Sequence, residues 1–419
     1  MHGKKREEYK AKLRDDKTAA ALAHKANQWH ALCRGLSERR RQQQTNDDDS
    51  SSLETIQETQ TLLEKALTVN PDPNHLWNHR RELLLLLIRR RQQTKGDDDD
   101  DFDFDLSTEL KLVQAALMRN PKAYGAWFHR KWCMAVSSRQ QKTTNSTTLW
   151  QQELALTAQF LQLDERNFHC WNYRRFIISG LLQGGSFWEE NENETDETKG
   201  KVIECGSWNV VGRKCNVEIP MGAQLVLQEQ LRPSSKQGSD TGGGSYNDDD
   251  DNISKLLQSE WDFSTQKIQD NFSNFSAFHY RSVLLPWKLQ SSGDDQAQSQ
   301  IMEEELQLVE NAFCTEPDDQ TSWWYHAFLL DMIDNKSNDK SFSVERARLE
   351  EQAALLRDLQ EDSPGKWVLL GLQRLLQSIG PDTVEEQMQV LEQLSEMDPD
   401  RSGRYQSLQQ QCSRSVSAQ

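Results

Sequence analysis

Apolar residues recur at helical spacing along most of the chain. The clearest stretches are Leu62-Leu63-Ala66-Leu67, Leu112-Val113-Ala116-Leu117 and Leu306-Val309-Ala312-Phe313. Apolar positions three and four apart predict amphipathic helices with one buried face. An Asn, Asp or Glu follows each stretch, often with Pro next, and these residues end a helix. The pattern therefore predicts helices that stop at short polar turns.

The turns belong to an internal repeat in which an aromatic residue follows the turn's first residue by seven positions. The copies are Asn70–Arg80, Asn120–Arg130, Asp164–Arg174, Asn271–Arg281 and Glu316–His326, with Trp367 as a degenerate sixth. The aromatic anchors at 77, 127, 171, 278, 323 and 367 are spaced by 50, 44, 107, 45 and 44 residues. The step of 107 residues equals one repeat period plus an insertion. We therefore predict an all-α protein, an α-solenoid of stacked helical hairpins, because a single hairpin cannot bury its own apolar face.

Trp and Arg in each copy lie three residues apart, on one face of the second helix. A buried Trp supplies apolar area, and the Arg beside it can bond to carbonyls or stack. We interpret the series as scaffold: Trp77, Arg80, Trp127, Arg130, Trp171, Arg174, Arg281 and Trp323.

Polar and acidic stretches interrupt the repeats. The predicted organisation is an N-terminal helical segment at 1–40, repeats 1–3 at 53–182, an insertion at 183–251, and repeats 4–6 with a C-terminal helix at 252–419. The insertion is rich in Gly, Asn and Asp, and we predict it to be disordered because it has little apolar surface to bury.

Composition narrows the function. The formal charge of −17 disfavours nucleic acid as a partner, because phosphate binding needs clustered Lys and Arg. The longest aliphatic run, Leu83–Ile88, is too short for a transmembrane segment, and the N-terminus has no apolar core for a signal peptide. Seven scattered cysteines without a C-x-x-C pair argue against a disulfide framework or a zinc site of this chain. We predict a cytoplasmic protein.

Trp-x-x-Arg units about 44–50 residues apart resemble the alpha subunits of protein prenyltransferases, most of all those of the Rab type. The specific strings are Asp164–Arg175, Asn271–Arg281, Met397–Tyr405 and the opening Met1-His2-Gly3. The resemblance covers nearly the whole chain outside the insertions.

The resemblance implies one subunit of a heterodimeric enzyme. In the family the alpha subunit curls around a beta subunit that holds the zinc ion and most of the lipid pocket. Enzymes of the Rab type transfer geranylgeranyl from geranylgeranyl diphosphate to C-terminal cysteines of Rab GTPases, which a Rab escort protein presents. Partners of this chain are then a beta subunit, the escort protein and Rab GTPases.

Lys122 and Tyr124 are the candidate catalytic residues. No other repeat carries this pair at the turn. A lysine supplies a compact cation for a diphosphate leaving group, and a tyrosine donates a hydrogen bond to a phosphate oxygen. The string Asn-Pro-Lys-x-Tyr matches the family motif whose Lys and Tyr contact the diphosphate. Without the resemblance, the residues alone favour the ordinary interpretation, in which Lys122 is a solvated turn charge and Tyr124 packs locally.

Three further observations concern specificity and partners. Gly125 stands where the family's farnesyl and type I members have a Gln that binds a substrate carboxylate, which favours the Rab type; a simple packing requirement for a small residue is the alternative. Arg166, Asn167 and His169 occupy the matching turn of the next repeat and are candidates to face the same cleft. The alternative is that they are ordinary polar turn residues or contact the beta subunit. His2 is a speculative ligand for the partner's zinc, and this chain has no metal site of its own.

Two other functions stay open from the residues. The chain is alternatively the alpha subunit of farnesyltransferase or geranylgeranyltransferase type I, or a non-enzymatic helical-repeat scaffold.

Overall fold

The computed structural model describes residues 16–45, 52–94, 106–140, 146–182, 247–336, 344 and 346–417. Every regular element among these residues is a helix. His2 and positions 183–246 of the predicted insertion lie outside the described residues. The last five positions of that predicted range are helical, because α12 begins at Asn247.

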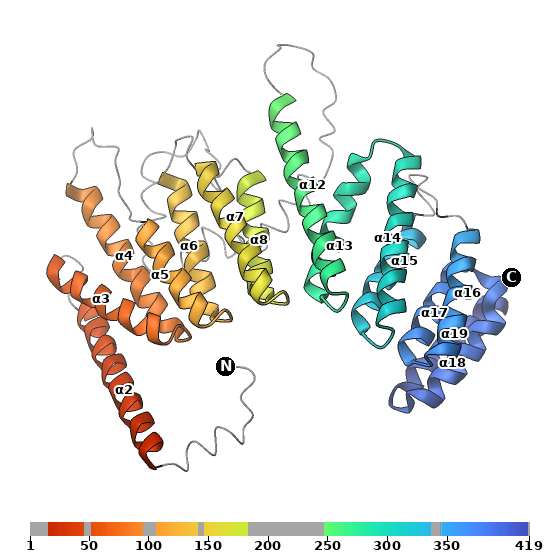
Figure 1. The fold of residues 1–419 in the computed structure, drawn as a ribbon, viewed down its shortest axis with the longest axis horizontal. Helices are drawn as coiled ribbons and strands as arrows, with labels where there is room; N and C mark the ends of the chain where they lie inside the picture. Colours follow the sequence, from red (N-terminus) through yellow and green to blue (C-terminus); the bar gives the residue numbers. More distant parts are fainter. Residues whose placement is uncertain are drawn as a thin grey trace. The chain divides into compact units, whose positions relative to one another are not determined.

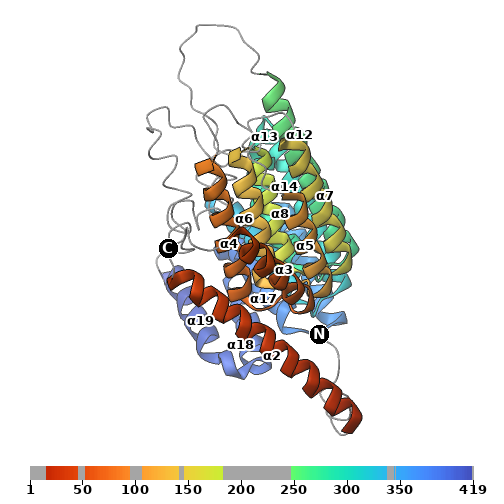
Figure 2. The same cartoon turned by 90° about the vertical axis from the view of Figure 1, so that its left-hand side faces the viewer.

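The chain divides into two units, Met1–Gln230 and Leu231–Gln419. The described helices of the first unit are α2 (Asp16–Thr45), α3 (Leu53–Val69), α4 (Asn74–Thr94), α5 (Leu106–Arg119), α6 (Tyr124–Gln140), α7 (Ser146–Leu163) and α8 (Phe168–Leu182). Helices α3 and α4, α5 and α6, and α7 and α8 pack as hairpins, and α2 packs on α3. The second helices α4, α6 and α8 lie side by side in one layer of this unit (Figures 1 and 2).

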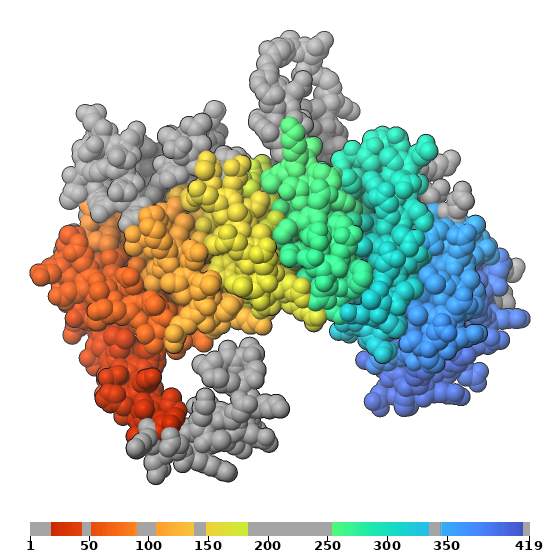
Figure 3. All heavy atoms as spheres, in the orientation of Figure 1, coloured from red at the N-terminus to blue at the C-terminus, as the bar shows by residue number. Residues whose placement is uncertain are grey.

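The second unit repeats this arrangement. Its described helices are α12 (Asn247–Asp270), α13 (Phe275–Ser291), α14 (Asp295–Thr315), α15 (Gln320–Lys336), α16 (Arg346–Asp362), α17 (Lys366–Ile379), α18 (Val384–Met397) and α19 (Ser402–Ser417), with short 3-10 turns η1 (Pro381–Thr383) and η2 (Pro399–Arg401). Hairpin partners are α12 and α13, α14 and α15, α16 and α17, and α18 and α19. The colours in Figure 3 change in chain order along each unit, as a repeat array requires when each hairpin packs on its neighbours.

The C-terminal end differs from the sequence prediction in two ways. Two helices, α18 and α19, follow α17 where the sequence analysis predicts one, because Asp398 and Pro399 form another polar turn. Trp367 is the second residue of α17 and is only half-buried, whereas the anchor in the other repeats is the fourth residue of its helix. The buried Leu369 takes that place. The sixth repeat therefore uses a leucine as its anchor.

Four Trp anchors close the turn that precedes their own helix. The indole nitrogens of Trp77, Trp127 and Trp323 donate to the carbonyl oxygens of the turn prolines six residues earlier, at 2.8, 2.7 and 2.8 Å. Trp171 donates in the same way to Glu165, at 2.8 Å. A single side chain thus fills the core and satisfies a turn carbonyl, which explains why Trp recurs at this position.

Buried arginine–glutamate pairs join neighbouring repeats. The guanidinium groups of Arg80, Arg130 and Arg281 donate to the carboxylates of Glu109, Glu153 and Glu305, each on the first helix of the following repeat. Each of these carboxylates also accepts a hydrogen bond from the second helix of its own repeat. The donors are His129, Tyr173 and Tyr325, and each lies 20 positions after the glutamate that it contacts. Buried charges are tolerated when they are paired and hydrogen-bonded in this way. Each glutamate therefore fixes the register between two hairpins.

Arg174, like the other repeat arginines, bonds to the first helix of its own hairpin. It donates to the hydroxyl of Thr157 at 2.8 Å and to the carbonyl of Leu154 at 3.3 Å. Both partners lie on α7, so Arg174 stabilises its own hairpin.

None of the described helices combines the length and the apolar character that crossing a bilayer requires.

Candidate functional site

The site begins at the turn between α5 and α6. The side-chain oxygen of Asn120 accepts a hydrogen bond from the backbone N–H of Lys122 at 3.0 Å, which shapes the turn. The carbonyl oxygen of Pro121 accepts two bonds, from the Trp127 indole at 2.7 Å and from the Asn167 amide at 2.9 Å. Asn167 belongs to the turn of the next repeat, so this carbonyl holds the two turns together.

Lys122 and Tyr124 both face solvent at this turn. Tyr124 is the first residue of α6 and is 64% exposed. The Lys122 side chain is 50% exposed, and its Nζ lies 3.4 Å from a carboxylate oxygen of Asp164 on the next turn. An ion pair this exposed contributes little stability. Both side chains are therefore available to a ligand or a partner.

The next turn brings His169 against Tyr124. The two rings meet edge to face with centroids 4.5 Å apart. Burial, Lys131 and Lys122 together lower the pKa of His169, so the ring is neutral at pH 7. Arg166 is exposed on the same turn. The structure thus brings Lys122, Tyr124 and His169 into one cluster.

Asn167 stabilises the turn and is not available to a ligand. It is buried, and its side-chain oxygen accepts from the backbone N–H of His169 at 3.1 Å while its amide donates to Pro121. This cap begins α8 and aims His169 toward Tyr124.

Gly125 lies against the preceding repeat. A Cβ at this position would be 2.4 Å from Cδ1 of Trp77 and 2.7 Å from the side-chain oxygen of Asn74. The close approach of α6 to α4 is thus a sufficient physical reason for a glycine. It also means that a glutamine could not stand here without moving Trp77.

Glu109, His129 and Cys133 lie close enough together to hold a metal ion. Arg80 donates to both oxygens of Glu109, at 2.8 and 2.5 Å, and the Nε2 of His129 lies 3.1 Å from one of them. Burial would raise the pKa of Glu109, but the hydrogen bonds from His129 and Arg80 lower it to about 2. The carboxylate is thus already neutralised by a guanidinium, and we assign the cluster to the network between repeats.

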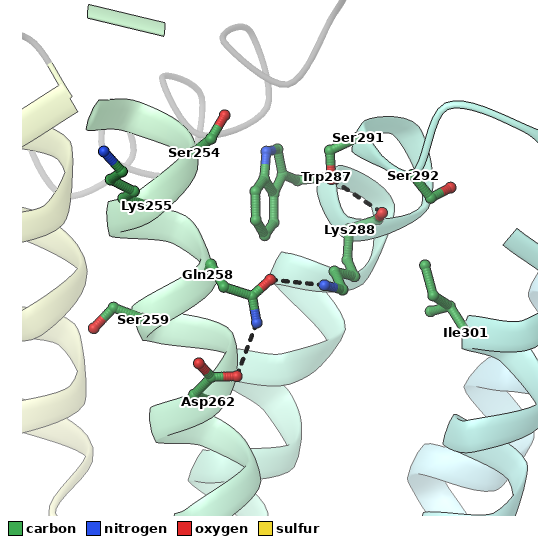
Figure 4. Close-up of a pocket in the computed structure, with 10 residues that line it drawn as sticks. All are labelled: Ser254, Lys255, Gln258, Ser259, Asp262, Trp287, Lys288, Ser291, Ser292 and Ile301. Carbon is green, nitrogen blue, oxygen red and sulfur yellow. Dashed lines mark hydrogen bonds between the residues drawn. The ribbon is translucent and has the colours of Figure 1, made fainter. Parts of the chain in front are cut away.

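A groove of about 610 Å³ lies in the second unit, between α12, α13 and α14 (Figure 4). The Lys288 ammonium donates to the Gln258 side-chain oxygen at 2.7 Å, and the Gln258 amide donates to Asp262 at 2.8 Å. These polar groups use their hydrogen-bonding capacity on one another, so we assign no catalytic or binding role to the groove.

The sequence analysis missed the buried glutamates and Lys131. A usable signal exists for the glutamates, since Glu109, Glu153 and Glu305 each precede the His or Tyr that they contact by 20 residues. A lone glutamate on a helix is ordinarily exposed, however, and its spacing from the arginine partner varies between 23 and 29 residues.

The repeats match a known family. The description "Protein prenyltransferase alpha subunit repeat" fits residues 56–87, 106–136, 150–181, 257–287 and 302–333, which are the hairpins from α3 to α8 and from α12 to α15. The chain belongs to the protein prenyltransferase alpha-subunit family. Lys122 and Tyr124 lie within the second of these family repeats, and His169 lies within the third.

Two relatives, from a mammal and from a yeast, carry the same name. The chain is 29% identical to "Geranylgeranyl transferase type-2 subunit alpha" of Homo sapiens over 289 residues, 68% of this chain and 36% of that protein. The corresponding protein of Saccharomyces cerevisiae is 24% identical over 362 residues, 84% of each chain. The alignment thus spans about a third of the length of the mammalian relatives.

One solved structure also aligns with the chain. "Candida albicans protein geranylgeranyltransferase-I complexed with GGPP" is matched over 80% of this chain and 90% of that chain, at a TM-score of 0.34 and 16% identity. A score this low supports no structural argument.

Proposed function

We propose that this chain is the alpha subunit of a heterodimeric Rab geranylgeranyltransferase. Its task would be to assist transfer of geranylgeranyl from its diphosphate to C-terminal cysteines of Rab GTPases, with a beta subunit carrying the zinc ion and a Rab escort protein presenting the substrate. The observation that carries the proposal is the cluster of exposed Lys122 and Tyr124 with buried His169 on a prenyltransferase alpha-subunit scaffold. The names of the relatives support the type II assignment. We expect the enzyme to work in the cytoplasm.

The chemistry needs charge stabilisation on the leaving group. As the cysteine sulfur bonds to C1 of the lipid, the C1–O bond breaks and its electrons leave with the diphosphate. Lys122 would neutralise part of this charge, and the Tyr124 hydroxyl would donate to a phosphate oxygen. A zinc ion on the beta subunit would bind that cysteine and keep it in the thiolate form. In the free chain the Lys122 Nζ lies 3.4 Å from a carboxylate oxygen of Asp164, and an arriving diphosphate would displace this partly buried carboxylate.

Exposed aromatic residues support a protein partner. Phe168 in the first unit and Phe275 in the second are 52% and 53% exposed, and each is the first residue of its repeat's second helix, as Tyr124 is. Large apolar side chains repeated at an exposed position are typical of an interaction surface. The beta subunit is the partner that this family supplies.

Gly125 fits the type II assignment. No side chain projects from this position, and the packing of Trp77 leaves no room for one. The chain therefore offers no donor here for a substrate's terminal carboxylate.

Co-expression with candidate beta subunits tests the proposal. We expect a stable heterodimer that transfers geranylgeranyl to a Rab protein in the presence of escort protein. Lys122→Ala should lower the transfer rate about 10- to 100-fold, the loss typical of one charge-assisted contact, and should leave assembly intact. Lys65→Ala, which removes an exposed lysine of α3, is the matched control and should have no effect.

Three outcomes would count against the proposal. Farnesyl transfer to proteins without escort protein would indicate the farnesyl or type I enzyme. A monomer that binds no beta subunit would indicate a scaffold. An unchanged rate in Lys122→Ala would remove Lys122 from the site.

A further inference from the structure

Lys131 is a partly buried cation without an anionic partner among the described residues. It lies on α6, and its Nζ is 5.7 Å from the ring centroid of Phe176 on α8. It forms no hydrogen bond or ion pair with any described residue. Burial and the neighbouring Arg175 guanidinium lower its pKa to about 8. A desolvated ammonium without a counterion costs stability, so its presence indicates a ligand that supplies the missing negative charge.

The position of Lys131 relates it to the candidate site. Tyr124 and Lys131 are seven residues apart on α6, which places them two turns apart on one face of that helix. His169 and Phe176 have the same spacing on α8, which packs beside α6 (Figure 1). The contacts Tyr124–His169 and Lys131–Phe176 therefore lie on one α6–α8 surface, at two levels that are two helical turns apart.

Helix geometry and charge relate Lys131 to the first of these levels as well. Helical side chains tilt toward the N-terminus of their helix, and the N-terminus of α6 is the end that carries Tyr124. The charges of Lys131 and Lys122 both act on His169 and lower its pKa. His169 thus lies under the influence of two cations, one from the turn and one from the helix.

The same helix position distinguishes the two units. The residue after the repeat arginine is a cation in the first unit, at Arg81, Lys131 and Arg175, whereas Ser282 follows Arg281 in the second. Arg81 is occupied, since it donates to the Asn78 side chain. Among these cations, Lys131 combines burial with the lack of a bonded partner in the described part of the chain.

We propose that Lys131 is a second anion-binding residue of the site, which binds the diphosphate of the isoprenoid donor together with Lys122, across Tyr124 and His169. This inference rests on the proposed function for its ligand class. Lys122 is already paired with Asp164 in the free chain, so Lys131 supplies the uncompensated charge that attracts a diphosphate.

Two binding measurements test the proposal. The first is equilibrium binding of geranylgeranyl diphosphate to the heterodimer, and the second is calorimetric titration of the full chain with inorganic pyrophosphate. Lys131→Met should lower both affinities about tenfold, and Lys131→Arg should retain them, because both measurements depend on a charged side chain. Lys111→Met, which removes an exposed lysine of the neighbouring α5, should change neither.

A pH series separates a ligand contact from a structural role. Lysine at 131 loses its proton near pH 8, whereas arginine stays charged. We therefore compare the diphosphate affinity of the native enzyme with that of Lys131→Arg as a ratio. This ratio should fall between pH 7 and pH 9.5, because groups that titrate in both proteins affect both affinities equally. Among the described residues, the titratable and charged groups that interact electrostatically with Lys131 are Arg175 and His169 of α8. The charged groups that neighbouring helices direct at α6 interact with His129 or Arg130 instead; they are Arg80, Arg81, Glu109 and Glu153.

The outcomes distinguish this inference from the proposed function. Equal affinities of the native protein and Lys131→Met, or a ratio that does not change with pH, would overturn the role of Lys131. Transfer that depends on Lys122 but not on Lys131 would leave the proposed function standing. Pyrophosphate binding that depends on Lys131, in a chain that forms no active heterodimer, would support the anion site and reject the enzyme assignment.

Discussion

At Gly125 helix α6 approaches Trp77 so closely that one methyl group would collide with the indole ring. Gly125→Ala should therefore destabilise the first unit by about 1–3 kcal/mol, because Trp77 is fully buried and has no free volume to enter. Thermal unfolding followed by circular dichroism measures the change.

Gly403→Ala is the matched control. Gly403 also lies in a helix, α19, but a Cβ there meets nothing within 4 Å. Alanine is the better helix former, so this change should be neutral or stabilise the chain by up to about 1 kcal/mol. If Gly125→Ala were equally harmless, the close packing on Trp77 would not be the reason for the glycine.

The candidate residues divide into two kinds. Lys122 and Tyr124 were predictable because they depart from the repeat at one turn, and a departure from a repeated scaffold is visible in the sequence. Lys131 was not predictable, because a lysine beside Arg130 on an amphipathic helix resembles an ordinary exposed lysine. Its burial depends on how α8 packs against α6.

Helices of neighbouring repeats are joined by buried ion pairs. In the second unit Arg281 and Glu305 have side chains 5% and 1% exposed, with the Tyr325 hydroxyl bonded to the same carboxylate. Glu305→Ala should destabilise the chain by about 3–5 kcal/mol, because it leaves a buried guanidinium without a counterion. Chemical denaturation should show a lower midpoint.

An exposed pair on the next hairpin provides the comparison. Arg346 and Glu350 of α16 are about half exposed, and water screens such pairs so well that they contribute little to stability. Glu350→Ala should therefore leave the midpoint nearly unchanged. Equal effects of the two substitutions would mean that the buried pair does not stabilise the stacking of hairpins.

Acid stability of the whole chain depends on buried imidazoles in both units. Burial lowers the pKa of His79, His129 and His326 to about 4 each, against about 6.5 in an unfolded chain. A histidine whose pKa is lower in the folded chain than in the unfolded chain binds a proton more strongly in the unfolded chain. Stability should therefore fall as the pH drops from about 6.5 to about 4, by on the order of 1–3 kcal/mol for each histidine.

The melting temperature between pH 7 and pH 4 measures this loss. His326→Gln should make the decline shallower, because glutamine does not titrate and its amide can still donate to Gln352, the present partner of His326 at 2.8 Å. A native chain whose stability is constant over this range would contradict the assignment of neutral, buried imidazoles.

The sequence by itself determined the all-α repeat fold, the turns and five of the six aromatic anchors. These features follow from short-range periodicity and from turn chemistry, which a linear pattern records. Trp77, Trp127, Trp171 and Trp323 were predictable as core for this reason. So was the exceptional turn at Lys122 and Tyr124.

Tertiary structure decided what lies between hairpins. The packing pairs Glu109, Glu153 and Glu305 with arginines of the preceding repeat. It puts Leu369 in the anchor position in place of Trp367, and it lays Lys131 against the Phe176 ring. Each depends on contacts between residues in different helices, and a sequence pattern does not specify how far one helix lies from another or which charges are removed from water. Burial and pairing of charge are properties of the packed repeats, so only the folded chain assigns them.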